Sequence, residues 1–257
     1  MSAKYLALAT DYDGTIAQHS DVTNATHDAL QRWKDAGRKL LLVTGRELPD
    51  LQKVCPFTKM FDCIVAENGA MLYWPGTGQK NTLTAAPPKE FIDCLRARGV
   101  SPLSFGEAIV ATQETYKGVV LEVIEELGLK LKVILNKGAL MVLPTSVDKA
   151  TGLGAAANAM GLALADIAGV GDAENDQVFL ALCGYSAAVG NALSFLKKQV
   201  HYVTKATHGA GVEELIDKLL ASDGRTLPEK TSQPELFKDA HETTPLIGAE
   251  MRDPKAS

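Results

Sequence analysis

The chain has 257 residues, of which 26 are Lys or Arg and 31 are Asp or Glu, giving a formal net charge of −5 at pH 7. This mild acidity argues against a protein that binds nucleic acid or an anionic membrane through broad electrostatic contact, because such partners need clustered positive charge. With 46% hydrophobic and 22% charged residues, the chain can bury a core, which excludes global disorder.

Features of membrane or secreted proteins are missing from the sequence. The longest apolar runs, such as residues 40–43, are far shorter than the roughly 20 residues of a membrane-spanning helix. The N-terminus leads directly into a strand-like run without a signal-peptide core, which predicts a cytoplasmic protein. Four widely spaced cysteines form no C-x-x-C pair, so we expect free thiols rather than a zinc site or disulfides.

The first part of the chain alternates short apolar runs with helical patterns. Gly37 follows the first helical pattern, as is typical of a residue that ends a helix. The βαβαβ order predicts a parallel sheet covered by helices. The expected strands are 5–10, 39–44 and 62–66, and the expected helices are 26–36 and 48–54.

The same alternation returns after Asp148. Gly161 is placed to end the first helix of this second part. We expect residues 1–72 and 146–221 to form one α/β core, a Rossmann-like parallel sheet with helices on both faces. The expected elements of the second part are a helix to Met160, a strand at 166–170, a helix at 175–182, a strand at 186–189 and a helix at 212–220.

Between these parts, residues 73–145 predict an inserted α+β unit. Its last two expected strands, 131–135 and 139–143, are joined by Asn136-Lys137-Gly138, a compact hairpin signal. An insertion at this point of the sheet is suited to form a cap over the ligand-binding edge. The proline-rich residues 222–257 predict a flexible tail.

The first motif that carries chemistry is Asp11-Tyr12-Asp13-Gly14-Thr15, at the end of the first expected strand. In open α/β sheets the carboxyl ends of the strands face the ligand crevice. Two carboxylates and a glycine therefore give a charged, tightly turned loop at that crevice. The alternative interpretation is an ordinary solvated turn.

The second motif is Thr44-Gly45-Arg46, at the end of the second strand and before a helix. This segment is suited to bind a phosphate oxygen, because it offers a hydroxyl, adjacent backbone N–H groups and the N-terminus of the following helix. By itself, this tripeptide is more often a simple turn between a strand and a helix.

Asp172 and Asp176 follow a later strand, where helix capping is the alternative explanation for either residue. Carboxylates gathered with Asp11 and Asp13 at one sheet edge would repel, unless a hard divalent cation such as Mg²⁺ neutralises them. Lys149 opens the helix after the insertion, where a lone lysine is usually a surface residue. A nearby phosphate or carboxylate would favour its charge at a helix start.

In this order and spacing, D-x-D-G-T, T-G-R, Lys and G-D-x-x-N-D resemble the motifs of the haloacid dehalogenase superfamily. The resemblance covers roughly residues 4–220 and is to the Cof-type, sugar-phosphatase-like branch with a type IIB cap. The short insertion resembles the smaller caps of archaeal phosphoglycolate phosphatases. Three further segments are similar to secondary motifs of the branch. They are Glu67-Asn68-Gly69-Ala70, Val189-Gly190-Asn191-Ala192 and His208-Gly209-Ala210-Gly211-Val212.

The resemblance implies a two-step phosphoryl transfer. Asp11 would be the nucleophile that forms an aspartyl-phosphate, and Asp13 the general acid and then the general base. The implied phosphate-binding residues are Thr44, Gly45, Lys149 and Asn175. The implied Mg²⁺ ligands are Asp11, Asp13 (also through its backbone carbonyl), Asp172 and Asp176.

The sequence thus predicts a Mg²⁺-dependent phosphatase acting on a small phosphorylated metabolite, such as phosphoglycolate or a sugar phosphate. The alternatives are a phosphomutase of the same superfamily and a non-catalytic module that senses a phosphate ligand. Neither a nucleic-acid nor a membrane partner is expected, and the sequence does not indicate an oligomeric state. Polar cap residues that could recognise the leaving group, or could be ordinary surface residues, are Glu107, Thr112, Lys117, Asn136 and Lys137.

Overall fold

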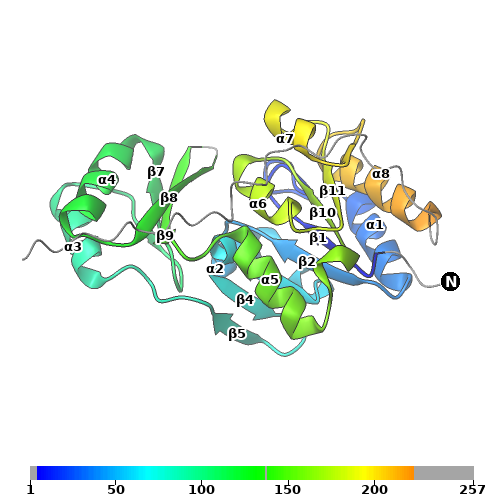
Figure 1. The fold of residues 1–257 in the computed structure, drawn as a ribbon, viewed down its shortest axis with the longest axis horizontal. Coiled ribbons are helices and arrows are strands. Elements are labelled where there is room, and N and C mark those ends of the chain that lie inside the picture. Colours follow the sequence, from blue (N-terminus) through cyan, green and yellow to red (C-terminus); the bar gives the residue numbers. More distant parts are fainter. Residues whose placement is uncertain (1–4, 137, 223–257) are drawn as a thin grey trace, which may run out of the picture.

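The computed structural model describes residues 5–136 and 138–222, so the expected tail lies outside the described residues except for Ser222. Two units lie side by side along the long axis of the molecule (Figure 1). The larger unit is an α/β core that contains both chain segments expected to form it. The smaller unit is the inserted α+β cap. No helix among the described residues combines the length and the apolar character needed to cross a membrane.

The core is built on a single eight-stranded sheet, which confirms that the two parts of the chain share one sheet. The strands from β12 to β3 are parallel, and β4 and β5 add an antiparallel edge. In spatial order the strands are β12 (Tyr202–Val203), β11 (Tyr185–Ala188), β10 (Ile167–Gly171), β1 (Ala7–Thr10), β2 (Lys39–Val43), β3 (Cys63–Ala66), β4 (Met71–Trp74) and β5 (Gln79–Thr82).

The hairpin of β4 and β5 belongs to the core sheet, although the sequence suggested an insertion starting at residue 73. That boundary falls inside β4. All four residues of β5 are exposed, so this edge strand shows no alternation of apolar and polar residues that would reveal it in the sequence.

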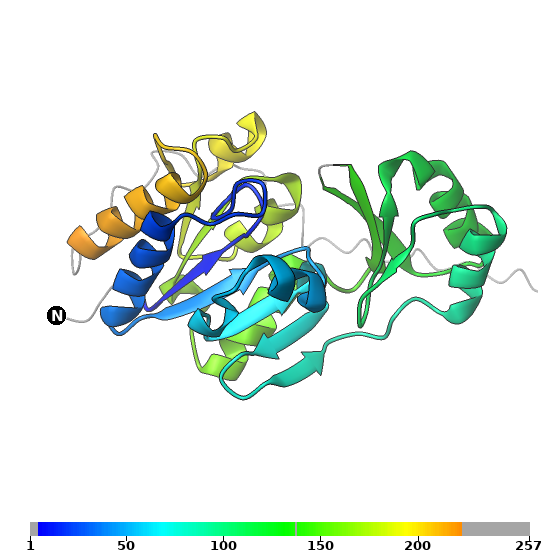
Figure 2. The ribbon, with the colours of Figure 1, turned by 180° about the vertical axis from the view of Figure 1, so that it is seen from behind.

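Helices cover both faces of the core sheet, as expected. The pair α1 and α8 packs on one face, and α5 and α6 lie on the other (Figures 1 and 2). Gly37 and Gly161 follow α1 and α5 with positive φ angles of 77° and 67°, which confirms both helix ends. The core helices are α1 (Asn24–Asp35), α2 (Leu48–Val54), α5 (Lys149–Met160), α6 (Gln177–Leu180), α7 (Ser194–Gln199) and α8 (His208–Ala221).

The cap is a four-stranded antiparallel sheet with two helices on the face that points away from the core (Figures 1 and 2). The expected hairpin is confirmed, since Asn136 of β8 pairs with Ala139 of β9. The sheet order is β6 (Ser104–Phe105), β7 (Val110–Gln113), β9 (Ala139–Pro144) and β8 (Leu131–Asn136), and the helices are α3 (Lys89–Ala97) and α4 (Lys117–Glu126).

The strands β7 and β9 alternate between the two faces of the cap sheet. Val110 and Val142 are buried in the cluster that includes Phe91 of α3. Ile109, just before β7, and Met141 of β9 are one position away and belong to a separate buried cluster. Because side chains alternate along a strand, one set of apolar residues holds the helices and the other faces the core.

Candidate active site

The carboxyl ends of neighbouring parallel strands bring the expected site residues to one edge of the core sheet. Asp11 follows β1, Thr44 follows β2 and Asp172 follows β10, and β1 lies between the other two strands. Because these strands are parallel, the residues after them meet at the same edge.

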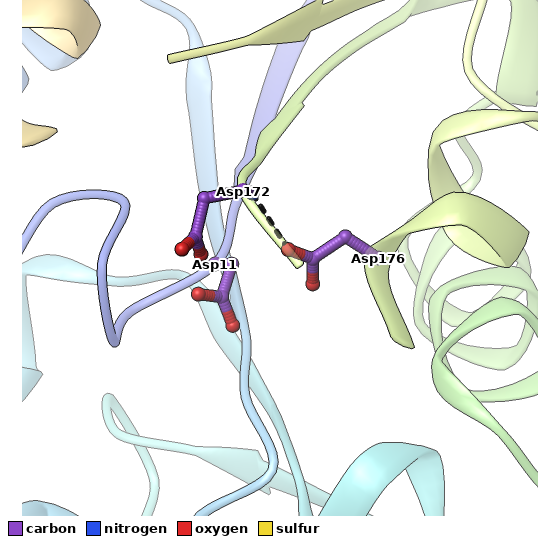
Figure 3. A group of neighbouring side chains, drawn as sticks. All are labelled: Asp11, Asp172 and Asp176. Atoms are coloured by element: carbon purple, nitrogen blue, oxygen red, sulfur yellow. Dashed lines mark hydrogen bonds between the residues drawn. The ribbon is translucent and has the colours of Figure 1, made fainter. Parts of the chain in front are cut away.

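Three carboxylates form a buried cluster at this edge. One oxygen from each of Asp11, Asp172 and Asp176 lies within 4.8 Å of the other two. Figure 3 shows Asp11 and Asp172 at adjacent strand ends, with Asp176 approaching from the following turn. Asp11 and Asp172 are each 5% exposed, and Asp176 is fully buried. This arrangement concentrates negative charge in a region from which water is largely excluded.

Lys149, the first residue of α5, reaches into the cluster and is 1% exposed. Its Nζ lies 2.6 Å from Asp11 Oδ1 and 2.6 Å from Asp176 Oδ1. Burial alone would lower the pKa of Lys149, but the charges of Asp11 and Asp176 outweigh it, so the pKa is raised. The lysine is therefore a fixed positive charge within the site, not a surface residue.

Asp11 has an unusual electrostatic environment for a carboxylic acid. Burial first, and then the negative charge of Asp176, raise its pKa from 3.8 to about 8. The charge of Lys149 acts in the opposite direction without cancelling these effects. In the absence of a further cation, ionisation of Asp11 is thus strongly disfavoured.

The composition of the cluster fits a hard divalent cation. The cluster holds three carboxylates, of which Lys149 pairs with two, so in the ionised state it carries an excess of negative charge. Carboxylate oxygens are the ligands that Mg²⁺ prefers. Asp11 and Asp172 are suited to hold such an ion. Asp176 has less capacity, because Oδ1 accepts from Lys149 and Oδ2 accepts from the N–H groups of Asp172 and Ala173.

Asp13 lies apart from the three-carboxylate cluster and faces Arg46. The Arg46 Nε and Nη2 atoms lie 2.6 and 2.7 Å from the two Asp13 oxygens, a bidentate ion pair. Arg46 also contacts Asp50 at 2.5 Å and the Ser20 hydroxyl at 2.8 Å. The sequence did not indicate this role of Arg46, because no local pattern shows which carboxylate an arginine will meet.

The other three expected phosphate-binding residues lie in loops around the same edge. The buried Thr44 hydroxyl accepts a hydrogen bond from the Arg46 N–H at 3.1 Å, and Gly45 lines the same cavity as Asp11. Asn175 donates to Asn68 Oδ1 at 2.9 Å. Asn175 is therefore tied to the turn after β3, a contact between residues 107 positions apart.

Secondary contacts fix the loop after β1. Thr15 donates to Asp172 Oδ1 at 3.1 Å, which joins this loop to the loop after β10. Asn191 donates to the Gly14 carbonyl at 2.8 Å and accepts from the His208 N–H at 2.7 Å. The motifs around Asn191 and His208 thus support the loop that carries Asp11 and Asp13.

A cavity of about 470 Å³ opens between the core edge and the cap. It has room for a small molecule beside Asp11. Its core side is polar and its cap side is mainly apolar. The core contributes Asp11, Asp13, Arg46 and Lys53, and the cap contributes Ser104, Ile109, Ala111 and Met141, among others.

The polar cap residues suggested by the sequence do not line this cavity where the structure describes them. Glu107 pairs with Lys80 at 2.8 Å, and Thr112 donates to the Pro102 carbonyl at 2.7 Å. Lys117 is exposed at the start of α4. Lys137 and the side chain of Asn136 lie outside the described residues.

Comparisons with known proteins agree with this architecture. A family model described as haloacid dehalogenase-like hydrolase matches residues 8–127 and 108–216. A phosphoglycolate phosphatase of Methanobrevibacter smithii is 30% identical over 230 residues, covering 83% of this chain and 98% of that protein. A phosphoglycolate phosphatase of Methanothermobacter thermautotrophicus is 26% identical over 223 residues, covering 83% of this chain and 98% of that protein.

Solved structures give the same fold. A haloacid dehalogenase-like hydrolase from Bacteroides thetaiotaomicron, 20% identical, superposes with a TM-score of 0.72 over 84% of this chain and 100% of that chain. The fold, the matched family model and the relative at 30% identity lead to one conclusion. The chain belongs to the haloacid dehalogenase-like hydrolase family.

Proposed function

We propose that this protein is a Mg²⁺-dependent phosphatase that hydrolyses a small phosphorylated metabolite, either phosphoglycolate or a sugar phosphate, through an aspartyl-phosphate. The observation that carries the proposal is the buried cluster of Asp11, Asp172 and Asp176 around Lys149, beside a cavity of small-molecule size. The relatives named phosphoglycolate phosphatase support the reaction class.

In the first step, Asp11 attacks the phosphorus atom. Lys149 holds Asp11 Oδ1, which leaves Oδ2 for the attack. An Oδ2–P bond forms, the P–O bond of the ester breaks, and Asp13 gives a proton to the departing alkoxide. Asp13 lines the cavity, where the leaving group would lie, and its bidentate contact with Arg46 must open for one of its oxygens to carry that proton.

In the second step, Asp13 acts in reverse. Its carboxylate takes a proton from a water molecule whose oxygen attacks the phosphorus of the aspartyl-phosphate. The bond between phosphorus and Asp11 breaks, and inorganic phosphate and the free carboxylate are regenerated. A proton donor two residues after the nucleophile suits an alkoxide leaving group, which must be protonated as it departs.

Positive charge is essential to both steps, because an anionic nucleophile approaches an anionic phosphoryl group. Lys149 supplies one such charge at the nucleophile itself, and the Thr44 hydroxyl, which accepts from the Arg46 N–H, would donate to a phosphate oxygen. The chemistry that Mg²⁺ supplies, when held by Asp11 and Asp172, is further neutralisation of the phosphoryl oxygens. Asp176 and Asn175 would hold the surrounding loop in place.

The inserted unit, residues 83–145 in this proposal, would cover the leaving group. Its apolar wall at Ile109 and Met141 would exclude water from the reacting atoms. On the core side, Lys53 lines the cavity and has no salt-bridge partner among residues 5–136 and 138–222. A second anionic group on the substrate, such as a carboxylate, could pair with it.

The test is hydrolysis of p-nitrophenyl phosphate and a panel of metabolite phosphate esters, with Mg²⁺ and with EDTA. We expect turnover only with Mg²⁺, and a loss of roughly 10³-fold or more in Asp11→Asn. Circular dichroism and thermal melting of the variant would show that its fold is kept.

Full activity in Asp11→Asn would contradict the assignment of the nucleophile. Transfer of phosphate to another sugar hydroxyl, seen by product analysis, would instead indicate a phosphomutase. Tight binding of a phosphate ester without turnover would indicate a sensing module.

A further inference from the structure

The turn after β3, residues Glu67–Gly69, lies at the junction of the core and the cap. We propose that Glu67 is a positioning residue that anchors the cap wall of the substrate cavity to the catalytic loops. The inference rests on the proposed phosphatase function for its consequence, but the anchor itself is a structural contact.

Toward the cap, Glu67 accepts two backbone hydrogen bonds. Its Oε1 and Oε2 atoms each lie 2.8 Å from an N–H nitrogen, those of Glu107 and Ala108. The Glu67 side chain is fully buried, so these bonds compete with little water. A carboxylate that accepts from two adjacent N–H groups makes a strong and directional contact.

The cap backbone also presses closely on this carboxylate. A Cβ atom placed on Gly106 would lie 2.5 Å from Glu67 Cδ, closer than side chains can approach. An alanine at residue 106 would therefore displace the Glu67 carboxylate or push the cap segment away from it. The contact thus depends on two residues, one from each unit.

The anchored segment leads directly into the cavity wall. Ile109 follows the anchored Ala108, and both Ile109 and Ala111 line the cavity. Ala111 of β7 pairs with Met141 of β9, which lines the cavity as well. The position of Glu67 therefore determines where this apolar wall lies.

Toward the core, the same turn is fixed to the catalytic loops. The N–H groups of Glu67 and Asn68 donate to the carbonyls of Arg46 and Thr44, each at 3.0 Å. Asn68 Oδ1 accepts from Asn175, in the loop that carries Asp172 and Asp176. The φ angles of Glu67 and Asn68, 54° and 52°, are rare for residues other than glycine. Such a conformation persists only where surrounding contacts hold it.

Gly69, the last residue of this turn, lies against the segment in which the chain returns from the cap to the core. Gly69 has a φ angle of 97°, and a Cβ atom there would lie 1.8 Å from the Asp148 carbonyl oxygen. Asp148 directly precedes Lys149 and caps α5. One short turn thus contacts the loops after β2 and β10, the start of α5 and the cap.

The ion pairs that join the two units are weaker candidates for this anchoring role. Lys80 pairs with Glu107 at 2.8 Å, and both side chains are more than 40% exposed. Lys132 and Asp148 are 3.6 Å apart and partly exposed. Exposed pairs of this kind hold a geometry weakly, because solvent screens them. The buried Glu67 contact is therefore the polar tie best able to set the position of the cap.

The test uses Glu67→Gln and Gly106→Ala in the full-length protein. The first places an amide N–H₂ against one backbone N–H group, and the second pushes the cap segment away. Hydrogen exchange of the Glu107 and Ala108 amides measures whether their hydrogen bonds to Glu67 are kept, independently of enzyme activity. We expect exchange at both amides to rise by about tenfold or more in each variant. In the double variant the effects should not add, because both changes break one contact.

Kinetics with two phosphoryl donors then test positioning. The aromatic ring of p-nitrophenyl phosphate would contact the cap wall, whereas acetyl phosphate has a very small leaving group. We expect KM for p-nitrophenyl phosphate to rise by about tenfold in either variant, with kcat for acetyl phosphate within about twofold of wild type. Lys80→Gln is the matched control, since it removes only the exposed pair with Glu107 and should leave both readouts unchanged.

Unchanged amide exchange in Glu67→Gln and Gly106→Ala would overturn the anchor. Equal losses with both donors would also overturn the positioning role, because a general folding defect reduces the active fraction for every substrate. If the wild-type protein hydrolysed neither donor and no ester of the metabolite panel, the proposed function would fail, while the exchange measurement would still decide whether Glu67 holds the cap.

Discussion

The two walls of the substrate cavity are built on different principles. The core wall is a set of charged, hydrogen-bonded groups, in which Asp11 and Lys149 are held at 2.6 Å. The cap wall is largely apolar, and Ile109 and Met141 line it through packing. The difference teaches that the chemistry resides in few precisely placed polar atoms, whereas the cap contributes shape. Changes to the core should therefore alter rates, and changes to the cap should alter substrate preference.

The largest effect that tests this contrast is expected for Asp13→Asn. Loss of the general acid should lower kcat/KM, which reports the first step, for an alkyl phosphate by about 10²–10⁴-fold. The loss should be smaller for p-nitrophenyl phosphate, because its leaving group is a weak base that needs little protonation. Steady-state kinetics with both substrates measures the difference. Asp50→Asn is the control, since Asp50 contacts the same arginine but is half exposed; equal losses in the two variants would refute the role of Asp13.

Lys149→Met should have the next largest effect on activity. It removes the positive charge from a buried group of carboxylates, and we expect kcat to fall by about 10²–10³-fold. Leaving buried carboxylates without their partner should also cost about 3–5 kcal/mol of stability in EDTA. Thermal melting should show a larger Mg²⁺-induced stabilisation in the variant than in wild type. Equal stabilisation in the two proteins would show that the ion and the lysine do not share the same carboxylates.

The pH dependence of metal binding should follow the pKa of Asp11. The metal-free folded state holds a proton on Asp11 up to about pH 8, above its ordinary pKa of 3.8. Mg²⁺ must displace that proton, so its apparent affinity should rise by up to about tenfold per pH unit from pH 6 to 8 and then level off. Calorimetric titration across this range measures the trend. If the affinity of the Asp11→Asn variant for Mg²⁺ showed the same pH dependence, the titrating group would not be Asp11.

The same pKa shift predicts how stability changes with pH in EDTA. Because the folded-state pKa lies above the ordinary value, the stabilisation is fully present below pH 3.8 and is lost as the pH rises toward 8. Metal-free protein should therefore lose stability steadily from about pH 4 to about pH 8, with part of that loss between pH 6 and 8. Urea unfolding at both pH values, with Asp11→Asn as the control, would measure the loss.

The smallest effect is expected in the cap. Ile109→Ala should raise KM for p-nitrophenyl phosphate by about tenfold and leave acetyl phosphate hydrolysis unchanged. Val110→Ala is the control, because its side chain packs toward the cap helices. It should lower the melting temperature without changing the ratio of the two activities. A change of kcat for both donors in Ile109→Ala would mean that the cap takes part in the chemistry.

Much of the core could be predicted from the sequence because strand ends in a parallel sheet converge. Apolar runs in the sequence predict the positions of β1, β2 and β10. If these strands are parallel neighbours, the polar residues that follow them must meet at one edge; these residues are Asp11, Thr44 and Asp172. The edge strand β5 escaped detection, since all its residues are exposed and it lacks an apolar face.

The cap side of the site could not be predicted in the same way. The polar candidates Glu107 and Thr112 make contacts elsewhere, while the cap side of the cavity is lined mainly by the apolar residues Ile109, Ala111, Ala139 and Met141. Apolar residues that face a cavity have the same sequence pattern as those that face a core. The contacts of Glu67 with the cap and of Arg46 with Asp13 depend on tertiary placement, which local spacing does not encode.

The order of the charged residues along the chain has a consequence for how the protein is made. Asp11 is synthesised first, Lys149 follows after the whole cap, and Asp172 and Asp176 come last. Because β1 pairs with β10, the central sheet cannot close until the ribosome has passed this last motif. The nascent chain therefore already contains the ammonium group when the second and third carboxylates arrive, and the buried acids need never gather without a counter-charge.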